Sequence, residues 1–154
     1  LGHGLNICAG MALAAKLDKK DYATMTLLGD GECYEGTVWE AAMFASHHCL
    51  NNLIAIIDRN KLVTLDKTEN ITRLEPFAEK WSSFGWEVKV IDGHKINDIT
   101  QSLVGFRNRN SNKPLVIIAN TIKGKGISFM ENQVKWHHGV PNKEHLETAL
   151  KELK

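Results

Sequence analysis

Two short polar stretches of the chain carry the residue types that could bind a metal–diphosphate group. One is Gly29-Asp30-Gly31, which continues as Glu32-Cys33-Tyr34-Glu35-Gly36, and the other is Asp58-Arg59-Asn60-Lys61-Leu62. Magnesium prefers hard oxygen ligands in an octahedral array at about 2.0–2.1 Å. The Asp30 carboxylate, the Asn60 amide oxygen and one backbone carbonyl would fill part of that array and leave positions for phosphate oxygens and water.

Each polar stretch directly follows an apolar run that is typical of a buried strand. These runs are 24–28 and 53–57. An isolated Asp-Gly pair most often forms a tight turn. Here the pair lies between a strand and a helix and is matched by Asn60, which favours a ligand site. The flanking glycines let the backbone approach phosphate, and the N–H groups at a helix start favour negative charge.

The remaining segments alternate between strand-like and helix-like patterns. Further strands are predicted over 86–91 and 115–119, and helices over 4–17, 37–49, 76–84, 97–109 and 143–153. This alternation predicts an α/β fold: a doubly wound, mostly parallel sheet with helices on both faces. Ligands of such sheets bind outside the carboxyl ends of the strands. Four loops follow these ends: Gly29-Asp30-Gly31, Asp58-Arg59-Asn60, Asp92-Gly93-His94 and Thr121-Ile122-Lys123-Gly124.

The helix predicted over 37–49 carries a single charged residue in its first part. Its shared face would be formed by Val38, Ala42, Ala45 and Cys49. A carboxylate at Glu40 is costly to bury without partners, although a Glu on a helix face can also reach solvent. Glu35 lies one turn earlier, and two close carboxylates tend to share a proton.

Other reactive side chains lie outside these motifs. His137-His138 could donate to phosphate or transfer protons, or could simply be surface-loop histidines. Lys123 and Lys125 are basic residues of the loop before them, and such lysines are more often solvated than functional. Cys33 lies beside the first motif, where a buried free cysteine is usually inert.

Composition excludes several classes of protein. A chain of 154 residues with 43% hydrophobic residues predicts one domain with a real core. A net charge of +1 argues against a nucleic-acid surface, and no apolar stretch reaches the roughly 20 residues of a membrane span. Three cysteines without CxxC spacing, Cys8, Cys33 and Cys49, suit a reducing compartment, so we expect the cytosol. No signal peptide is recognisable.

The motifs resemble those of the transketolase family of thiamine diphosphate enzymes, specifically their diphosphate-binding domain. The matching residues are Gly29-Asp30-Gly31 with Asn60, Glu35-Gly36 with Glu40-Ala41-Ala42, Leu1-Gly2-His3-Gly4, Thr121 to Gly126, and His138-Gly139. They occur in order over nearly the whole chain, so we treat 1–154 as a single diphosphate-binding domain. The sequence from Lys123 to Asn132 is similar to that of the N-terminal subunit of two-gene transketolases.

The resemblance implies a role for each matching residue. Thiamine diphosphate and Mg²⁺ (or Ca²⁺) would be the cofactors, and the metal would be bound by Asp30, Asn60 and the backbone carbonyl of Leu62. The cofactor would contact Gly29, Gly31, Ile122, Leu1 and His138. His138 would also lie near the donor substrate as a catalytic residue. Glu35 and Glu40 would join a carboxylate network at a dimer interface.

The resemblance also implies what this chain needs from elsewhere. In the family, substrate-facing histidines precede the Leu-Gly-x-Gly turn, and the glutamate that activates the aminopyrimidine lies in a pyrimidine-binding domain. We therefore expect an N-terminal segment to be missing. A pyrimidine-binding partner subunit or domain would be required, in a homodimer or heterotetramer. The complex would move a two-carbon ketol unit between sugar phosphates, and the chain alone would be inactive.

Other interpretations of the same residues stay open at this point. One is a non-catalytic remnant or assembly domain of the same fold. Another is a different thiamine diphosphate enzyme, such as a 2-oxo acid dehydrogenase or a deoxyxylulose phosphate synthase. A dinucleotide-binding domain is weaker, since no GxGxxG motif follows an early strand.

Overall fold

Four parallel strands form the centre of the computed structural model, which describes residues 1–154 apart from the side chain of Arg107. They are β1 (Thr24–Gly29), β2 (Leu53–Arg59), β3 (Glu87–Asp92) and β4 (Leu115–Asn120). Their order in the sheet is β1-β2-β4-β3, and every pairing is parallel. All four strands predicted from the sequence are therefore present, with β3 one residue later than the predicted 86–91.

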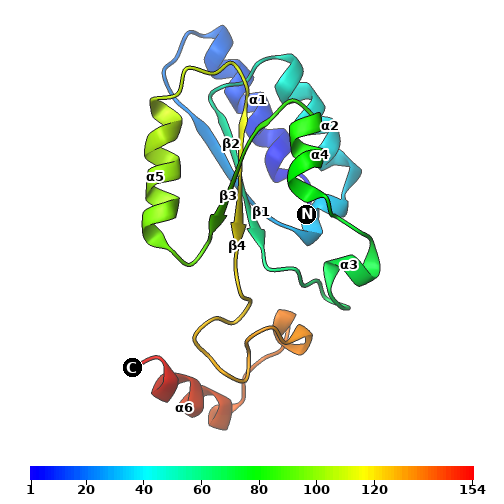
Figure 1. The fold of residues 1–154 in the computed structure, drawn as a ribbon, viewed down its shortest axis with the longest axis vertical. Helices are drawn as coiled ribbons and strands as arrows, with labels where there is room; N and C mark the ends of the chain where they lie inside the picture. The colour runs from blue at the N-terminus through cyan, green and yellow to red at the C-terminus, as the bar shows by residue number, and fades with distance from the viewer.

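Helices cover both faces of this sheet (Figure 1). One face carries α1 (Gly4–Leu17), α2 (Gly36–His47) and α4 (Phe77–Ser83), and the other carries α5 (Ile96–Arg107). Successive strand residues point to opposite faces, so Ala55 of β2 packs in the first core and Ile54 in the second. The predicted doubly wound α/β fold is confirmed.

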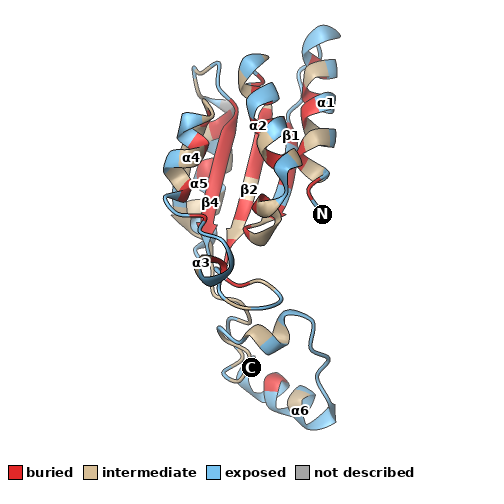
Figure 2. Ribbon diagram, turned by 90° about the vertical axis from the view of Figure 1, so that its right-hand side faces the viewer, coloured by how far each residue is buried: buried red, intermediate tan, exposed pale blue. Residues whose placement is uncertain are grey.

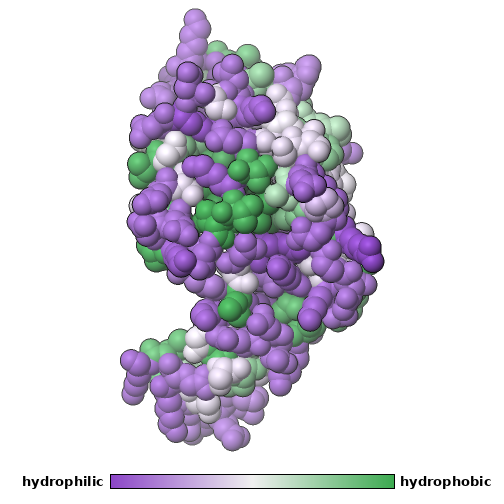
Figure 3. All heavy atoms as spheres, viewed as in Figure 1, coloured by the Kyte–Doolittle hydropathy of each residue, from purple (hydrophilic) through white to green (hydrophobic). Residues whose placement is uncertain are grey.

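Burial along the strands follows their place in the sheet. The five residues from Leu115 to Ala119 of central β4 are all buried, whereas every residue of edge strand β3 is at least partly exposed. Figure 3 shows a group of apolar residues near the middle of the view, over β3, where Val90 is 57% exposed. The central strands are red and the helices are mixed in colour in Figure 2.

One predicted helix is shorter than the sequence pattern suggested. We expected Cys49 on the buried face of a helix over 37–49, but α2 ends at His47 and Cys49 is exposed. Its φ of 48° is left-handed, so it cannot continue the helix. The placement of Cys49 in the helix was wrong, while Val38, Ala42 and Ala45 are buried as predicted.

Short elements and a C-terminal lobe complete the chain. The short elements are α3 (Thr68–Ile71) and the 3₁₀ turns η1 (Gly31–Tyr34) and η2 (Val134–His137). After β4 the chain leaves the sheet, passes through η2 and ends in α6 (Lys143–Glu152), beyond the carboxyl ends of the strands (Figure 1). Among the described residues, no helix combines the length and the hydropathy needed to span a bilayer.

An aromatic cluster joins the helices of the first face to the sheet. The ring of Trp86 meets that of Trp81 edge-on at 5.1 Å, and both side chains are buried. The indole N–H of Trp86 donates to the Ala42 carbonyl at 3.0 Å. This contact ties the start of β3 to α2, and so supports the helix that begins beside the first polar motif.

Candidate functional site

A cavity of about 450 Å³ lies at the carboxyl ends of β1 and β2. Its lining comes from the first two polar motifs, the loop that follows β2, and two residues of the C-terminal segment. These residues are Leu1, Gly29, Asp30, Gly31, Glu32, Tyr34, Asp58, Asn60, Leu62, Val63, Thr64, Leu65, Ile71, Lys123 and His137. The structure thus brings Asp30 to Asn60 and Leu62, which lie about thirty residues later in the sequence.

Asp30 is held by three hydrogen bonds and is 1% exposed. Its Oδ2 accepts from Arg59 Nη1 at 3.0 Å and from the Lys61 N–H at 2.7 Å, whereas Oδ1 accepts only from the Gly31 N–H at 2.8 Å. A carboxylate oxygen has two acceptor positions. Oδ2 is therefore fully used, and Oδ1 has one position left for a further ligand.

Asn60 is oriented by its neighbours in the same loop. Its Nδ2 donates to Asp58 Oδ2 at 3.1 Å, and its Oδ1 accepts from the Leu62 N–H at 3.0 Å. Asp58 in turn accepts from the Thr121 hydroxyl. These partners distinguish the amide oxygen from the amide nitrogen, and leave Oδ1 with a free lone pair.

This donor set fits a magnesium–diphosphate group. Carboxylate, amide and carbonyl oxygens are the ligands that Mg²⁺ takes, and the Leu62 carbonyl accepts no backbone hydrogen bond from the described loops and turns. No cluster of three or more His, Cys, Asp or Glu able to hold a metal occurs among the described residues, so the set depends on Asn60 and the backbone. A Cβ at Gly31 would lie 2.4 Å from Val63 Cγ1, which explains the need for glycine there.

Lys123 and His137 contribute basic groups to the cavity lining. Partial burial, with the positive charge of Lys123 second, lowers the pKa of His137. This shift favours the neutral imidazole, in which one nitrogen donates a hydrogen bond and the other accepts one. His138, which the resemblance assigned to this role, is not among the lining residues.

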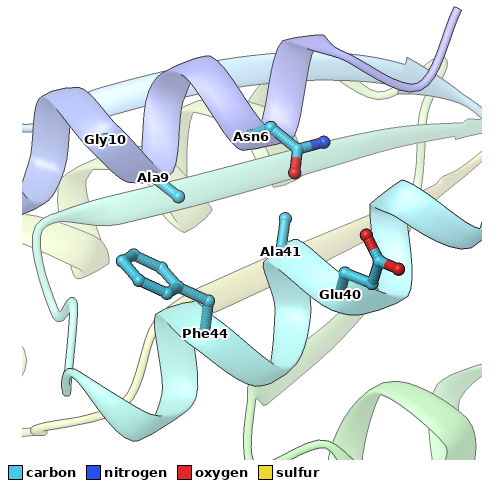
Figure 4. A pocket seen from close by; sticks show the side chains of 6 residues that line it. All are labelled: Asn6, Ala9, Gly10, Glu40, Ala41 and Phe44. Carbon is cyan, nitrogen blue, oxygen red and sulfur yellow. The ribbon is translucent and has the colours of Figure 1, made fainter.

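Three other predicted residues lie away from the cavity lining. Ile122 is half-buried beside it, and its N–H donates to His94 Nε2 at 2.7 Å. Glu40 lines a separate pocket of about 330 Å³ between α1 and α2 (Figure 4). In that view Asn6 and Ala9 of α1 face Ala41 of α2. Glu35 is the exposed residue just before α2.

Several residues of the site were not assigned a role from the sequence. Glu32 accepts from the Gly2 N–H at 2.9 Å and the Gly29 N–H at 3.3 Å, and so joins the chain start to the first motif. Arg59 contacts Asp30, and Asp58 contacts Asn60, so each orients one of the two candidate side-chain ligands. Glu32, Asp58 and Arg59 lie inside the two polar stretches, but their contacts with the candidate ligands and with the chain start are visible only in the folded structure.

Cys33 lies directly behind the first motif, and its side chain is buried. Burial, with the nearby Asp30 carboxylate second, raises the pKa of its thiol to about 12. Since the thiolate is the reactive form, this cysteine is unreactive, as expected of a buried free cysteine.

Comparisons with known proteins find similar sequences over almost the whole of this chain. Residues 1–153 match the family model described as "Transketolase, thiamine diphosphate binding domain". The chain is 47% identical over 153 residues to an apulose-4-phosphate transketolase subunit of Phocaeicola vulgatus, covering 99% of this chain and 54% of that protein. It is 36% identical over 154 residues to the transketolase of Homo sapiens, covering 99% of this chain and 24% of that one.

A solved structure has the same fold as this chain. The transketolase of Campylobacter jejuni superposes with a TM-score of 0.90 at 31% identity, over 99% of this chain and 25% of that one. The chain therefore spans about half the length of the Phocaeicola protein and a quarter of the longer enzymes.

Proposed function

This chain belongs to the transketolase family through its thiamine diphosphate-binding domain, and we propose that it binds thiamine diphosphate and Mg²⁺ as part of an enzyme that transfers a two-carbon ketol unit between sugar phosphates. The observation that carries the proposal is that Asp30, Asn60 and Leu62 all line one cavity. Each has an oxygen with unused acceptor capacity: Asp30 Oδ1, Asn60 Oδ1 and the Leu62 carbonyl.

The residues of the cavity have distinct roles in this proposal. Asp30, Asn60 and Leu62 would hold Mg²⁺, and Gly31, which also lines the cavity, would contact the diphosphate through its backbone. Lys123 and His137 would donate to phosphate oxygens from the C-terminal segment. When bound, thiamine diphosphate supplies the electron sink for carbon–carbon cleavage and formation, while the protein orients it and excludes water.

A partner that binds the pyrimidine end of the cofactor completes the proposed enzyme. The relative from Phocaeicola vulgatus is named as one subunit of its transketolase, and this name implies at least one other chain. That name and the name of a related 6-deoxy-6-sulfo-D-fructose transketolase subunit from Clostridium refer to different sugars. For this chain we propose a sugar phosphate as substrate, and the free cysteines support the cytosol as its compartment.

The α1–α2 surface is the proposed contact with a second copy. Its large apolar side chains are exposed: Ile7 by 62%, Met11 by 50%, Met43 by 53% and Phe44 by 39%. Exposed apolar groups of this size mark interaction surfaces. Glu40 lines the pocket between α1 and α2 together with Asn6 and Phe44 (Figure 4). Glu40 and Glu35 are the carboxylates that we propose for this interface.

Calorimetric titration tests the binding proposal directly. We expect heat of binding when thiamine diphosphate is added with Mg²⁺, and a loss of at least about tenfold in affinity when the metal is removed with a chelator. A pyrimidine-domain partner should tighten binding and permit turnover of a ketose phosphate, while pyruvate should not be consumed. Metal-independent binding would contradict the assigned ligand set. Tight binding without turnover in the complex would support the non-catalytic alternative.

We expect the two adjacent histidines to differ in their effect on thiamine diphosphate binding. His137 lines the cavity and His138 does not. We expect His137→Gln to weaken thiamine diphosphate binding about fivefold, the effect of one lost hydrogen bond, and His138→Gln to stay within about twofold of the parent, as for a surface substitution. The same calorimetric titration measures both. A larger loss for His138→Gln would restore the role that the sequence motif assigned to it.

A further inference from the structure

Arg59 makes the densest set of ionic contacts beside the cavity. It ends β2, and its side chain is only 2% exposed. Nη1 donates to Asp30 Oδ2 at 3.0 Å and to Thr68 Oγ1 at 2.9 Å, and Nη2 donates to Glu69 Oε1 at 3.1 Å and Glu75 Oε1 at 2.8 Å. One guanidinium thus joins the end of β1 to two later elements.

The acceptors of Arg59 also hold the backbone around them. Glu69 lies in α3 and accepts from the Leu74 N–H at 3.2 Å, and Glu75 accepts from the Phe77 N–H at 2.8 Å at the start of α4. The segment between β2 and α4 is therefore fastened at its far end to the same side chain that contacts Asp30. That segment provides six of the cavity-lining residues: Asn60, Leu62, Val63, Thr64, Leu65 and Ile71.

The chemistry of this position requires an arginine. The guanidinium is a planar fork that donates in several fixed directions, whereas a lysine ammonium is a point charge on a flexible stem. Three carboxylates surround this one cation, so the cluster keeps a negative charge and can still attract a metal cation at Asp30. Arg59 also uses the second acceptor position of Oδ2, which leaves Oδ1 as the open oxygen.

We propose that Arg59 is a positioning residue of the metal–diphosphate site: it turns Asp30 so that Oδ1 faces the cavity, and it fastens the 61–75 segment as the opposite wall. This inference rests on the proposed function for its metal part. The part that concerns the segment stands on the hydrogen bonds of Arg59 alone. Removing the guanidinium takes away one of the three hydrogen bonds that orient Asp30 and releases α3, so both metal affinity and protection of the segment are expected to fall.

The test compares variants of the full-length protein, together with its partner subunit where one is required. Arg59→Met is the main variant and Arg59→Lys the conservative one. Arg109→Met is the matched control, because Arg109 is also largely enclosed (side chain 10% exposed, against 2% for Arg59) and pairs with Glu87 at 3.0 Å, at the opposite end of the sheet. Two readouts are measured: the Mg²⁺ dissociation constant in the presence of thiamine diphosphate, and the rate of tryptic cleavage after Lys67 in the metal-free protein.

We expect Arg59→Met to weaken Mg²⁺ binding between about tenfold and 100-fold, as for other partners of metal ligands, and to speed cleavage after Lys67 by about tenfold or more. Arg59→Lys should recover part of the affinity, and Arg109→Met should change neither readout. Unchanged Mg²⁺ affinity in Arg59→Met would overturn the proposal, as would equal losses in Arg109→Met, which indicate general destabilisation.

The two readouts also separate this inference from the proposed function. If the parent protein itself binds no Mg²⁺ with thiamine diphosphate, the proposed function fails, and the metal part of this inference fails with it. The cleavage rate after Lys67 still decides whether Arg59 fastens the segment. Unchanged cleavage in Arg59→Met would overturn that part independently.

Discussion

Asp30→Asn should lower the Mg²⁺-dependent affinity for thiamine diphosphate by about 100-fold. Loss of a partner of a metal ligand costs up to about that much, and a ligand should matter at least as much as its partner. The substitution removes the negative charge and also conflicts with the local donors. Both carboxylate oxygens accept N–H groups, from Gly31 on one side and from Arg59 and Lys61 on the other. An amide NH₂ on either side would therefore face a donor.

Calorimetric titration of the variant with thiamine diphosphate and Mg²⁺ measures this effect. Asp66→Asn is a suitable control, since Asp66 lies in the neighbouring loop and bonds to Lys67 and Asn70 without lining the cavity. The control should bind within about twofold of the parent, as expected for a surface substitution. If Asp30→Asn bound metal and cofactor as tightly as the control, Asp30 could not be a metal ligand.

Trp86→Ala should destabilise the fold by about 3–5 kcal/mol, the usual cost of removing a large aromatic side chain from a core. Trp86 is 2% exposed, contacts the Trp81 ring and donates to the Ala42 carbonyl. Since domains are stable by only about 5–15 kcal/mol, this single change would remove a large share of the total.

Denaturant unfolding of the variant gives the change in free energy. Trp86→Phe keeps most of the apolar volume and loses the hydrogen bond, so its expected cost is about 1–2 kcal/mol. Trp136→Ala is the second control, because Trp136 packs on Phe129 in the C-terminal lobe, away from the sheet. If Trp136→Ala lowered the free energy of unfolding as much as Trp86→Ala does, the C-terminal lobe and the sheet would share one core.

The strands and the fold class could be predicted because burial leaves a direct pattern in the sequence. A strand covered on both faces is a continuous apolar run, and 53–57 and 115–119 have that composition. The end of α2 was harder to predict. Cys49 has an apolar side chain at helical spacing, and only its left-handed backbone excludes it from the helix.

The order of the strands decided which loops form the site. All four loops at the carboxyl ends of the strands were candidates, but the order β1-β2-β4-β3 places the end of β3 farthest from β1. The loop 92–94 therefore contributes no residue to the cavity lining. It contacts the neighbouring loop instead, where His94 accepts a hydrogen bond from the Ile122 N–H. Strand order depends on long-range packing, which no local pattern in the chain encodes.

Residue types and spacing by themselves determined the chemistry of the site: a carboxylate at Asp30 and an amide at Asn60, each placed at a strand end by the apolar run before it. Only the tertiary structure decided their surroundings. In the folded chain His137 lines the cavity and His138 does not. Three carboxylates from distant segments surround Arg59. The physical reason is that ligand type is a property of one residue, whereas orientation, burial and pairing arise only where separate segments meet.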